Sequence, residues 1–381
     1  MPSGVTDRVA PNSDAMGTKI GGFTAYSRLG LSVGYDDNVL ATENDEREDA
    51  RFRIEAPLAI ESNWSRHQLS MGGYISSDLY ADETSQDNLE WGIGASGQVD
   101  LQGDSGVKGL FGYQQLAEPR GGINAVNDVP DPVEYDLLQF GLVGNHSLNQ
   151  IDLSIGADIQ MYDYDDGSQQ YRDRDVWGIS GQGGYSFSPG YSGFVRGVYN
   201  QRDFENPSIS AGNPSQDSEG YKVVAGVASE ITNLISGEVY VGYLDQDYDS
   251  GVFSDVDGVS FGLNLEWEVT KLTLVRATAS RDVVDSTSPG DGGILYTIAG
   301  IGVEHELTPK IDLTGDVSYY NGDYEDSSRE DDGYRVSAGV DYRLSSMIHV
   351  DLVYSYDDRD SNRAGQDYSR NEVTLGVTLQ H

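Results

Sequence analysis

The chain has 381 residues, with 24 Lys and Arg against 63 Asp and Glu, which gives a formal net charge of −39. Such a charge argues against nucleic acid as a partner, because phosphate binding requires clustered Lys and Arg side chains. Cysteine is absent, which excludes a disulfide framework and thiolate chemistry.

Hydropathy excludes a further class of protein. No run of about 18 apolar residues occurs, so a transmembrane helix is not expected. The first 22 residues contain no apolar segment of the kind that a signal peptide needs. The hydrophobic fraction of 37%, together with 47 Gly and 25 Tyr, suits a structure that spreads apolar residues over one face of a long sheet.

Apolar and polar residues alternate along almost the whole chain. The segment that starts at residue 151 reads I, L, I, A, I, M at odd positions and D, S, G, D, Q at even positions. A period of two over about ten residues predicts a strand with one apolar and one polar face. We predict 18 such strands, at residues 22–36, 51–64, 67–80, 89–102, 106–117, 134–147, 150–163, 175–187, 190–203, 220–232, 234–247, 258–269, 271–283, 293–306, 309–322, 333–344, 347–358 and 368–380.

The connections between the predicted strands are alternately short and long. Short turns fall at residues 65–66, 103–104, 148–149, 188–189, 232–233, 270–271, 308–309 and 345–346. Long polar loops lie between them, as at residues 37–50, 118–133, 204–219 and 323–332. Each hairpin is therefore a repeat unit of about 40 residues.

Strands of this length favour a membrane barrel over a soluble sandwich, whose strands average about 5–6 residues. In lipid every backbone polar group must be paired, so the sheet must close. Long strands, short turns at one end, long loops at the other and an even strand number are typical of an outer-membrane barrel. We predict an all-β, antiparallel, up-and-down transmembrane barrel of 18 strands, with 16 strands as the alternative.

An even strand number also predicts the orientation of the barrel. Both termini and the short turns are expected on the periplasmic side, with the long acidic loops outside. Residues 1–20 are expected to form a periplasmic N-terminal segment that is either flexible or a plug. Residues 21–381 are expected to form a single transmembrane barrel domain.

The polar residues of the predicted inner face are mixed in sign. They indicate either a hydrated wall held by cross-strand ion pairs or a water-filled passage that favours cations or neutral solutes. Inward aromatic residues such as Tyr74, Phe194 and Tyr240 serve either as wall packing or as stacking surfaces for sugar rings. The predicted pore-lining residues are Asp152, Asp158, Arg196, Lys222, Glu230, Glu238, Asn264, Glu266, Arg276, Asp312, Asp316, Arg335, Asp341 and Arg343.

Carboxylates follow five strands at the predicted outer rim, in the stretches GYDDN (34–38), YDYDDG (162–167), LDQDYDS (244–250), NGDYEDS (321–327) and YSYDDRDS (354–361). All five stretches end odd-numbered strands, so we expect them at the same end of the barrel. The acidic outer rim is predicted to contain Asp36, Asp37, Asp163, Asp165, Asp245, Asp247, Asp249, Asp323, Asp357 and Asp358. Outward aromatic residues near strand ends, such as Tyr35, Tyr80 and Tyr243, are expected to anchor the barrel at the membrane interfaces.

One part of this rim resembles the first half of a calcium loop. Asp245, Asp247 and Asp249, followed by Gly251, place carboxylates at alternating positions, but Val256 stands where the loop would end in Glu. A solvated loop is the expectation. Weak binding of divalent cations, shared with lipopolysaccharide phosphates, is the alternative, and no other cofactor is expected.

The histidines argue against a hydrolytic site. His67, His146, His305, His349 and His381 lie beside short turns or at the C-terminus, and no G-x-S-x-G motif occurs. A carboxylate pair suited to glycoside hydrolysis is not excluded, but it has little specificity in so acidic a chain. We do not expect an enzyme.

Several longer stretches resemble a known family. They are GYDDNVLAT (34–42), RDRDVWG (172–178), SPGYSGFVRGVYNQRDFE (188–205), SEGYKVVAGV (218–227), VGYLDQDYD (241–249) and RDSNRAGQDYSRNEVTLGVTLQ (359–380). In order and spacing they are similar to the outer-membrane proteins called putative β-barrel porin 2, which occur in Gram-negative bacteria, often beside genes for exopolysaccharide or capsule production. The chain departs from the usual aromatic C-terminal signal, and Leu379 is expected in its place.

The resemblance implies an integral outer-membrane barrel with a role in polysaccharide export, and it assigns no site residue. We therefore expect a pore for polar solutes, most concretely the outer-membrane component of an exopolysaccharide export system. The alternatives are a plugged structural or adhesive barrel, whose acidic loops bind divalent ions or a partner, and a general diffusion porin. The expected partners are outer-membrane lipids, lipopolysaccharide, polysaccharide and periplasmic export proteins.

Overall fold

A computed structural model describes residues 15–126, 129–206, 214–232, 234–287 and 290–381. Helical structure in these ranges is limited to two 3₁₀ turns, η1 (Thr84–Gln86) and η2 (Gln170–Arg172). None of the helices described is long and apolar enough to cross a membrane. The strands are β1 (Thr18–Ile20), β2 (Phe23–Asp36), β3 (Asp49–Glu55), β4 (Leu58–Ser62), β5 (Gln68–Tyr80), β6 (Asn88–Asp100), β7 (Ser105–Ala117), β8 (Glu134–Leu148), β9 (Ile151–Tyr164), β10 (Arg174–Ser188), β11 (Tyr191–Phe204), β12 (Ser218–Thr232), β13 (Ile235–Tyr248), β14 (Val256–Thr270), β15 (Thr273–Asp285), β16 (Gly293–Thr308), β17 (Ile311–Tyr324), β18 (Glu330–Ser345), β19 (Ile348–Ser361) and β20 (Tyr368–Gln380).

These segments form a barrel of 18 crossing strands, as the sequence predicts, rather than the alternative of 16. β3 and β4 are two parts of one strand, since both keep the same register with β5: Glu55 lies opposite Ser76, and Leu58 lies opposite Gly73. The interruption falls at Pro57, which has no N–H to donate to a ladder. β1 is a short additional strand that pairs only with the start of β2.

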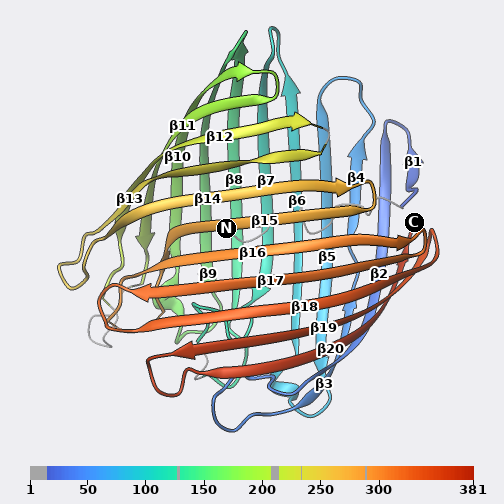
Figure 1. Cartoon of the computed structure of the whole chain (residues 1–381). Coiled ribbons are helices and arrows are strands. Elements are labelled where there is room, and N and C mark those ends of the chain that lie inside the picture. The colour runs from blue at the N-terminus through green and yellow to red at the C-terminus, as the bar shows by residue number, and fades with distance from the viewer. Residues whose placement is uncertain (1–14, 127–128, 207–213, 233, 288–289) are drawn as a thin grey trace.

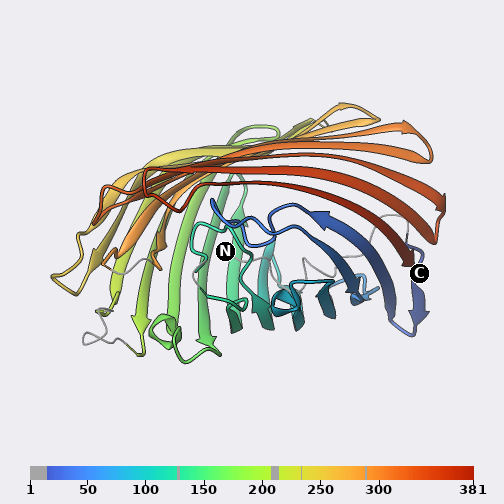
Figure 2. The same ribbon diagram turned by 90° about the horizontal axis from the view of Figure 1, so that it is seen from below.

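The barrel closes between its first and last long strands. Consecutive strands are antiparallel neighbours around the sheet, and β2 pairs with β20 from Arg28 opposite Gln380 to Asp36 opposite Glu372. Figure 1 shows the strands β14–β20 of one wall crossing the strands β5–β9 of the opposite wall, and Figure 2 shows the two walls from below. Such crossing follows from the tilt that strands need to close a barrel.

Large apolar side chains lie on the outside of this barrel. On β9 the odd positions Ile151, Leu153 and Ile155 are exposed, Ile155 by 67%, and the even positions carry polar residues. The same alternation recurs on β13, where Val239 and Val241 are exposed. A continuous exposed apolar belt of this extent is the surface that a barrel presents to lipid.

A ring of tyrosines marks the outer edge of the apolar belt. These outward hydroxyls donate hydrogen bonds to carboxylates on a neighbouring strand: Tyr113 to Asp136 at 2.6 Å and Tyr243 to Asp257 at 2.8 Å are two examples. The rings are thus held with their polar tips toward water, as interfacial aromatic residues require. Tyr80 differs from its predicted place, because it lies opposite Arg51 on the inner face.

The described part of the N-terminal segment adds to the seam of the barrel. β1 pairs with β2, with Ile20 opposite Phe23. Along β2 it lies just beyond the end of β20, where Ser27 and His381 exchange backbone hydrogen bonds. Most of the predicted periplasmic segment, residues 1–14, lies outside the described residues, so its role as a plug stays a prediction.

The assignment of the two faces predicts that a lysine destabilises the barrel on the outer face and has little effect on the inner face. Val241→Lys, near the middle of the apolar belt, is expected to lower the free energy of unfolding in lipid vesicles by about 2–4 kcal/mol. Asn264→Lys, on the inner face opposite Glu238, is the matched control and is expected to leave it within about 0.5 kcal/mol. Equal losses in urea titrations would contradict the assignment of faces.

Candidate functional site

The predicted pore-lining residues share the face of the sheet opposite the apolar belt, and many meet there in ion pairs. Arg196 on β11 binds Glu238 on β13 through two contacts of 2.9 and 3.2 Å. Arg276 on β15 lies between Glu266 and Glu304, at 2.9 and 3.2 Å. The remaining members of this predicted set on the inner face are Asp152, Asp158, Lys222, Asn264, Asp312, Asp316, Arg335, Asp341 and Arg343. The side chain of Glu230 lies outside the described residues.

Four carboxylates form a line across the periplasmic half of the inner face. Glu306 lies opposite Asp312, Asp312 opposite Asp341, and Asp341 opposite Asp351, on the adjacent strands β16–β19. We call these four residues the carboxylate row. Like charges directly opposite each other in a sheet repel, so this arrangement works against the stability of the wall. Glu306 and Asp351 are not among the predicted pore-lining residues, since only the cross-strand register brings them into line.

Arg343 neutralises the carboxylate row only in part. Arg343 binds Asp312, with Nε 3.0 Å from the carboxylate, and His349 Nδ1 lies 3.3 Å from Asp341. Among the described residues, Glu306 and Asp351 form no ion pair. All four side chains are partly exposed, so the row presents negative charge to the barrel interior.

Inner aromatic rings belong to the wall. Tyr74 and Phe194 are buried, and the guanidinium of Arg196 covers Phe194 at 4.9 Å from the ring centre. Tyr240 lies flat over the neighbouring strand β14, where the absence of a side chain at Gly262 makes room for it. A Cβ at Gly262 would lie 2.2 Å from the ring. These contacts favour wall packing over sugar stacking for Tyr74 and Phe194.

The loop that follows β7 folds into the outer mouth and reaches the opposite wall. Tyr324 on β17 donates to the carbonyl of Ile123 at 3.2 Å, and Tyr368 on β20 donates to the carbonyl of Gly121 at 3.1 Å. Gly121 has φ +78°, and a Cβ there would lie 2.5 Å from the Tyr368 hydroxyl. Only glycine permits both this backbone conformation and this approach.

A buried ion pair holds the base of the same loop. The two terminal nitrogens of the Arg172 guanidinium donate to the Glu118 carboxylate, one of them at 3.1 Å, and the guanidinium covers the ring of Tyr164 at 4.2 Å. Burial opposes the charged form of Arg172, but Tyr164 and Glu118 outweigh burial and raise its pKa. Within the loop, burial lowers the pKa of Arg120.

A second segment closes the mouth from the side of β15 and β16. Asp285 at the end of β15 binds Arg202 on β11 and lies 3.0 Å from Nε of Arg174 on β10. Burial raises the pKa of Asp291, in the loop that follows. The outer mouth is therefore crossed by the loop after β7 and by the end of the β15–β16 hairpin.

The aspartates of the predicted acidic rim fall into two groups rather than one exposed rim. Asp36 and Asp357 are buried on the inner side, where Asp36 accepts the N–H of Asn38 at 2.9 Å and Asp357 binds Arg335 and Arg370. The others lie outward or in loops and include acceptors for tyrosine and amide groups. They are Asp37, Asp163, Asp165, Asp245, Asp247, Asp249, Asp323 and Asp358.

The predicted calcium ligands belong to β13 and the turn after it, and weak binding of divalent cations stays a prediction. Asp245 accepts a hydrogen bond from Tyr221 at 3.1 Å, and Asp245 and Asp247 are two residues apart on the outward face of β13. In the described ranges, no group of three or more His, Asp or Glu side chains is placed to hold a metal ion. The pairing of this segment into the wall explains the difference from a calcium loop.

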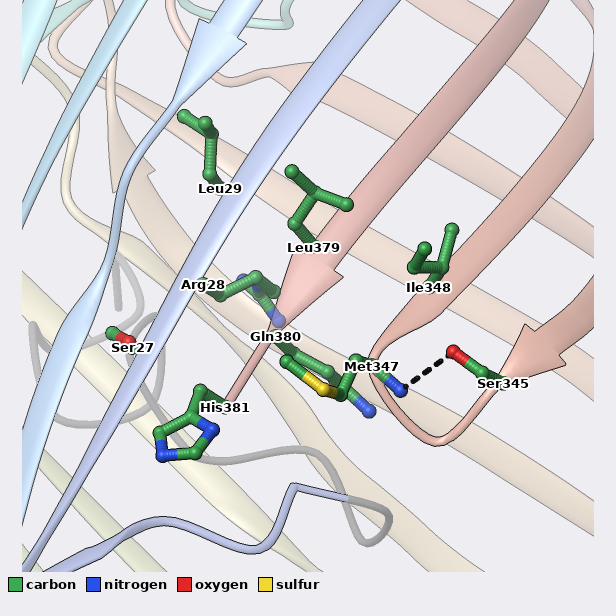
Figure 3. Close-up of a pocket in the computed structure, with 9 residues that line it drawn as sticks. All are labelled: Ser27, Arg28, Leu29, Ser345, Met347, Ile348, Leu379, Gln380 and His381. Carbon is green, nitrogen blue, oxygen red and sulfur yellow. Dashed lines mark hydrogen bonds between the residues drawn. The ribbon is translucent and has the colours of Figure 1, made fainter.

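A hollow of about 420 Å³ lies at the periplasmic end of the seam. Figure 3 shows Leu29, Ile348 and Leu379 around it, beside His381 at the end of the chain. These three apolar side chains are exposed members of the apolar belt. The hollow therefore belongs to the lipid-facing surface rather than to the barrel interior.

The closed sheet, its apolar outer belt and its charged inner face define an integral outer-membrane β-barrel. The chain belongs to the family described as Putative beta-barrel porin 2, which matches residues 10–381. No curated protein sequence matches the chain.

The fold is similar to that of several solved structures. OpdO of Pseudomonas aeruginosa has 13% identity and a TM-score of 0.50, over 95% of this chain and 98% of that one. OccAB3 of Acinetobacter baumannii has 9% identity and a TM-score of 0.50, over 95% and 100% of the two chains. The outer membrane protein opdK of Pseudomonas aeruginosa has 10% identity and a TM-score of 0.49, over 94% and 99%. At these identities the likeness concerns the fold alone.

The ion pair between Arg172 and Glu118 predicts that removing one carboxylate charge lowers the stability of the barrel strongly. Glu118→Gln leaves the buried Arg172 without its carboxylate and is expected to lower the free energy of unfolding by about 3 kcal/mol. Asp45→Asn is the control, because its pair with Arg47 is exposed on the surface and is expected to contribute less than about 1 kcal/mol. Urea unfolding followed by tryptophan fluorescence measures both. A loss for Glu118→Gln no larger than that for Asp45→Asn would contradict a structural role for the pair.

Proposed function

We propose that the barrel conducts polar solutes across the outer membrane and favours cations and neutral solutes over anions. The observation that supports the proposal is the carboxylate row, which presents four carboxylates to the interior with Arg343 bound to one of them, Asp312. A charged wall inside a low-dielectric barrel concentrates counter-ions and raises their rate of entry. The predicted pore-lining residues take the role of a hydrated wall in this proposal.

Export of exopolysaccharide is the narrower form of the proposal. It is supported by the resemblance to a family whose members often stand beside polysaccharide genes, and by an inner face of charged and amide groups able to exchange hydrogen bonds with sugars. The carboxylate row favours a neutral or amine-bearing chain over a strongly acidic one. A polymer also needs a wide mouth, so the contacts that cross the outer end must open for transport.

Those same contacts favour a second candidate, a plugged structural barrel. Hydrogen bonds from Tyr324 and Tyr368 fix the loop after β7 to the opposite wall, and Asp285 joins β15 to β10 and β11. A barrel held permanently in this form would scaffold or adhere rather than transport. General diffusion of small solutes is the third candidate and would need a mouth that stays open.

Planar bilayers separate these candidates. The purified barrel is expected to conduct, with a reversal potential in a salt gradient that shows cation preference. A double variant, Glu306→Gln with Asp351→Asn, is expected to lower the cation-to-anion permeability ratio about twofold or more. Glu219→Gln, whose carboxylate binds Tyr199 on the outer surface, is the control and is expected to leave the ratio unchanged. Silence of an intact barrel, or preference for anions, would overturn the proposal.

Polysaccharide export has its own measurement in cells. Loss of the protein is expected to reduce polysaccharide in the medium and to increase it in the periplasm. The Glu118→Gln variant is a useful comparison, since it loosens the mouth without changing the carboxylate row. Unchanged polysaccharide in both compartments would remove the narrower proposal and leave conduction of small solutes.

A further inference from the structure

The barrel wall is incomplete at its outer end, between β14 and β15. The ladder between these strands runs from Thr270 opposite Thr273 to Gly262 opposite Ser280, and it stops there. β14 continues to Val256 and β15 to Asp285, but they pair only with β13 and β16. In Figure 1 the end of β15 turns away from β14. We call residues 281–287 and 290–295 the flap.

Three side chains donate hydrogen bonds to carbonyls of the flap, which forms no ladder with β14. Ser260, which is fully buried, donates to the carbonyl of Arg281 at 3.1 Å. Arg202 donates to the carbonyl of Val283 at 3.0 Å. Gln216 donates to the carbonyl of Ser286 at 2.9 Å. Three side chains, from β11, from the segment before β12 and from β14, thus bind carbonyls of the flap where no ladder is formed.

Charge fixes the flap in this position. The Asp285 carboxylate is shared by Arg202 and Arg174 on the far strands β11 and β10. Asp282, at the start of the flap, binds Lys222 on β12. We call the ion pairs of Asp285 with Arg174 and Arg202 the clasp. A carboxylate between two largely buried guanidinium groups binds strongly, because removing one member leaves uncompensated charge.

The apolar face of the flap fits two environments. In the folded-in position Val283 and Leu295 pack against Tyr248, Phe253 and Val256. If the ladder of β14 and β15 continued in its present register, Val283 would lie opposite Val259. Val259 is exposed on the lipid-facing belt. Val283 and Leu295 would then face lipid, so both positions bury these two side chains away from water. Arg281 and Asp285 lie on the same face of β15 and would turn outward with them.

We propose that the flap is a gate with two states. In the folded-in state it lies across the mouth and Asp285 binds Arg174 and Arg202. In the zipped state this clasp is broken and the flap pairs with β14, which continues the ladder between β14 and β15. This regulation rests on the proposed channel function. Zipping exchanges the three side-chain hydrogen bonds for a regular ladder, so the carbonyls of Arg281 and Val283 have partners in both states. The folded-in state narrows the mouth and the zipped state completes the wall.

Single-channel recordings test the clasp. Asp285→Asn is expected to raise the ratio of open to closed time by about tenfold or more, since it leaves two arginines without their carboxylate. Asp357→Asn is the matched control, because Asp357 is also shared by two arginines, Arg335 and Arg370, but lies within the continuous wall. Equal open times in wild type and Asp285→Asn would overturn the gate.

A reversible lock tests the same states. A Cβ placed at Gly258 would lie 3.6 Å from the side chain of Leu295 in the folded-in position, and β15 would separate these residues in the zipped one. The pair Gly258→Cys and Leu295→Cys is expected to hold the channel closed under oxidation and to release it on reduction. Unchanged conductance after proven disulfide formation would contradict the gate.

Labelling distinguishes failure of the gate from failure of the channel. In a Gly258→Cys variant, reaction with a membrane-impermeant maleimide is expected to be about tenfold faster when Asp285→Asn is added. Faster labelling without conductance in any variant would support the moving flap and remove the channel proposal. Conductance with unchanged labelling would support the channel and remove the gate.

Discussion

The pairing of backbone polar groups governs this structure. In lipid an unpaired N–H or C=O costs several kcal/mol, so a sheet that crosses the membrane must join its first strand to its last. The ladder between β2 and β20 meets that requirement. Closure in turn divides every strand into an apolar outer face and a polar inner face. The chemistry of the interior depends on that division.

The same constraint explains how much the sequence could predict. Alternation along the chain predicts the strand number. Along β9 and β14 it also predicts the inward positions of residues such as Asp158 and Glu266, because the side to which a side chain of a strand points depends on the local chain alone. Register across strands is not local. The carboxylate row therefore could not be found, since Glu306 and Asp351 become neighbours of Asp312 and Asp341 only through three separate ladders.

The outer end shows a second limit of sequence reasoning. The predicted strand at residues 271–283 is expected to be an ordinary wall strand, yet the end of β15 is bound by side chains from β11, β12 and the segment before β12. Asp36 and Asp357 likewise read as exposed acids until their burial is known. Loops that fold inward are set by long-range contacts, such as Gly121 with Tyr368, that no periodicity encodes.

The central claim is that the polar face lines a water-filled interior while the apolar face meets lipid. The absence of native cysteine allows a scan of single cysteines along β14, at residues 263, 264, 265 and 266, in lipid vesicles. We expect the cysteines at 264 and 266 to react with a water-soluble thiol reagent. At 263 and 265 an attached fluorophore should be quenched by labelled lipid chains. Equal reactivity at all four positions, or quenching at 264 and 266, would contradict the account.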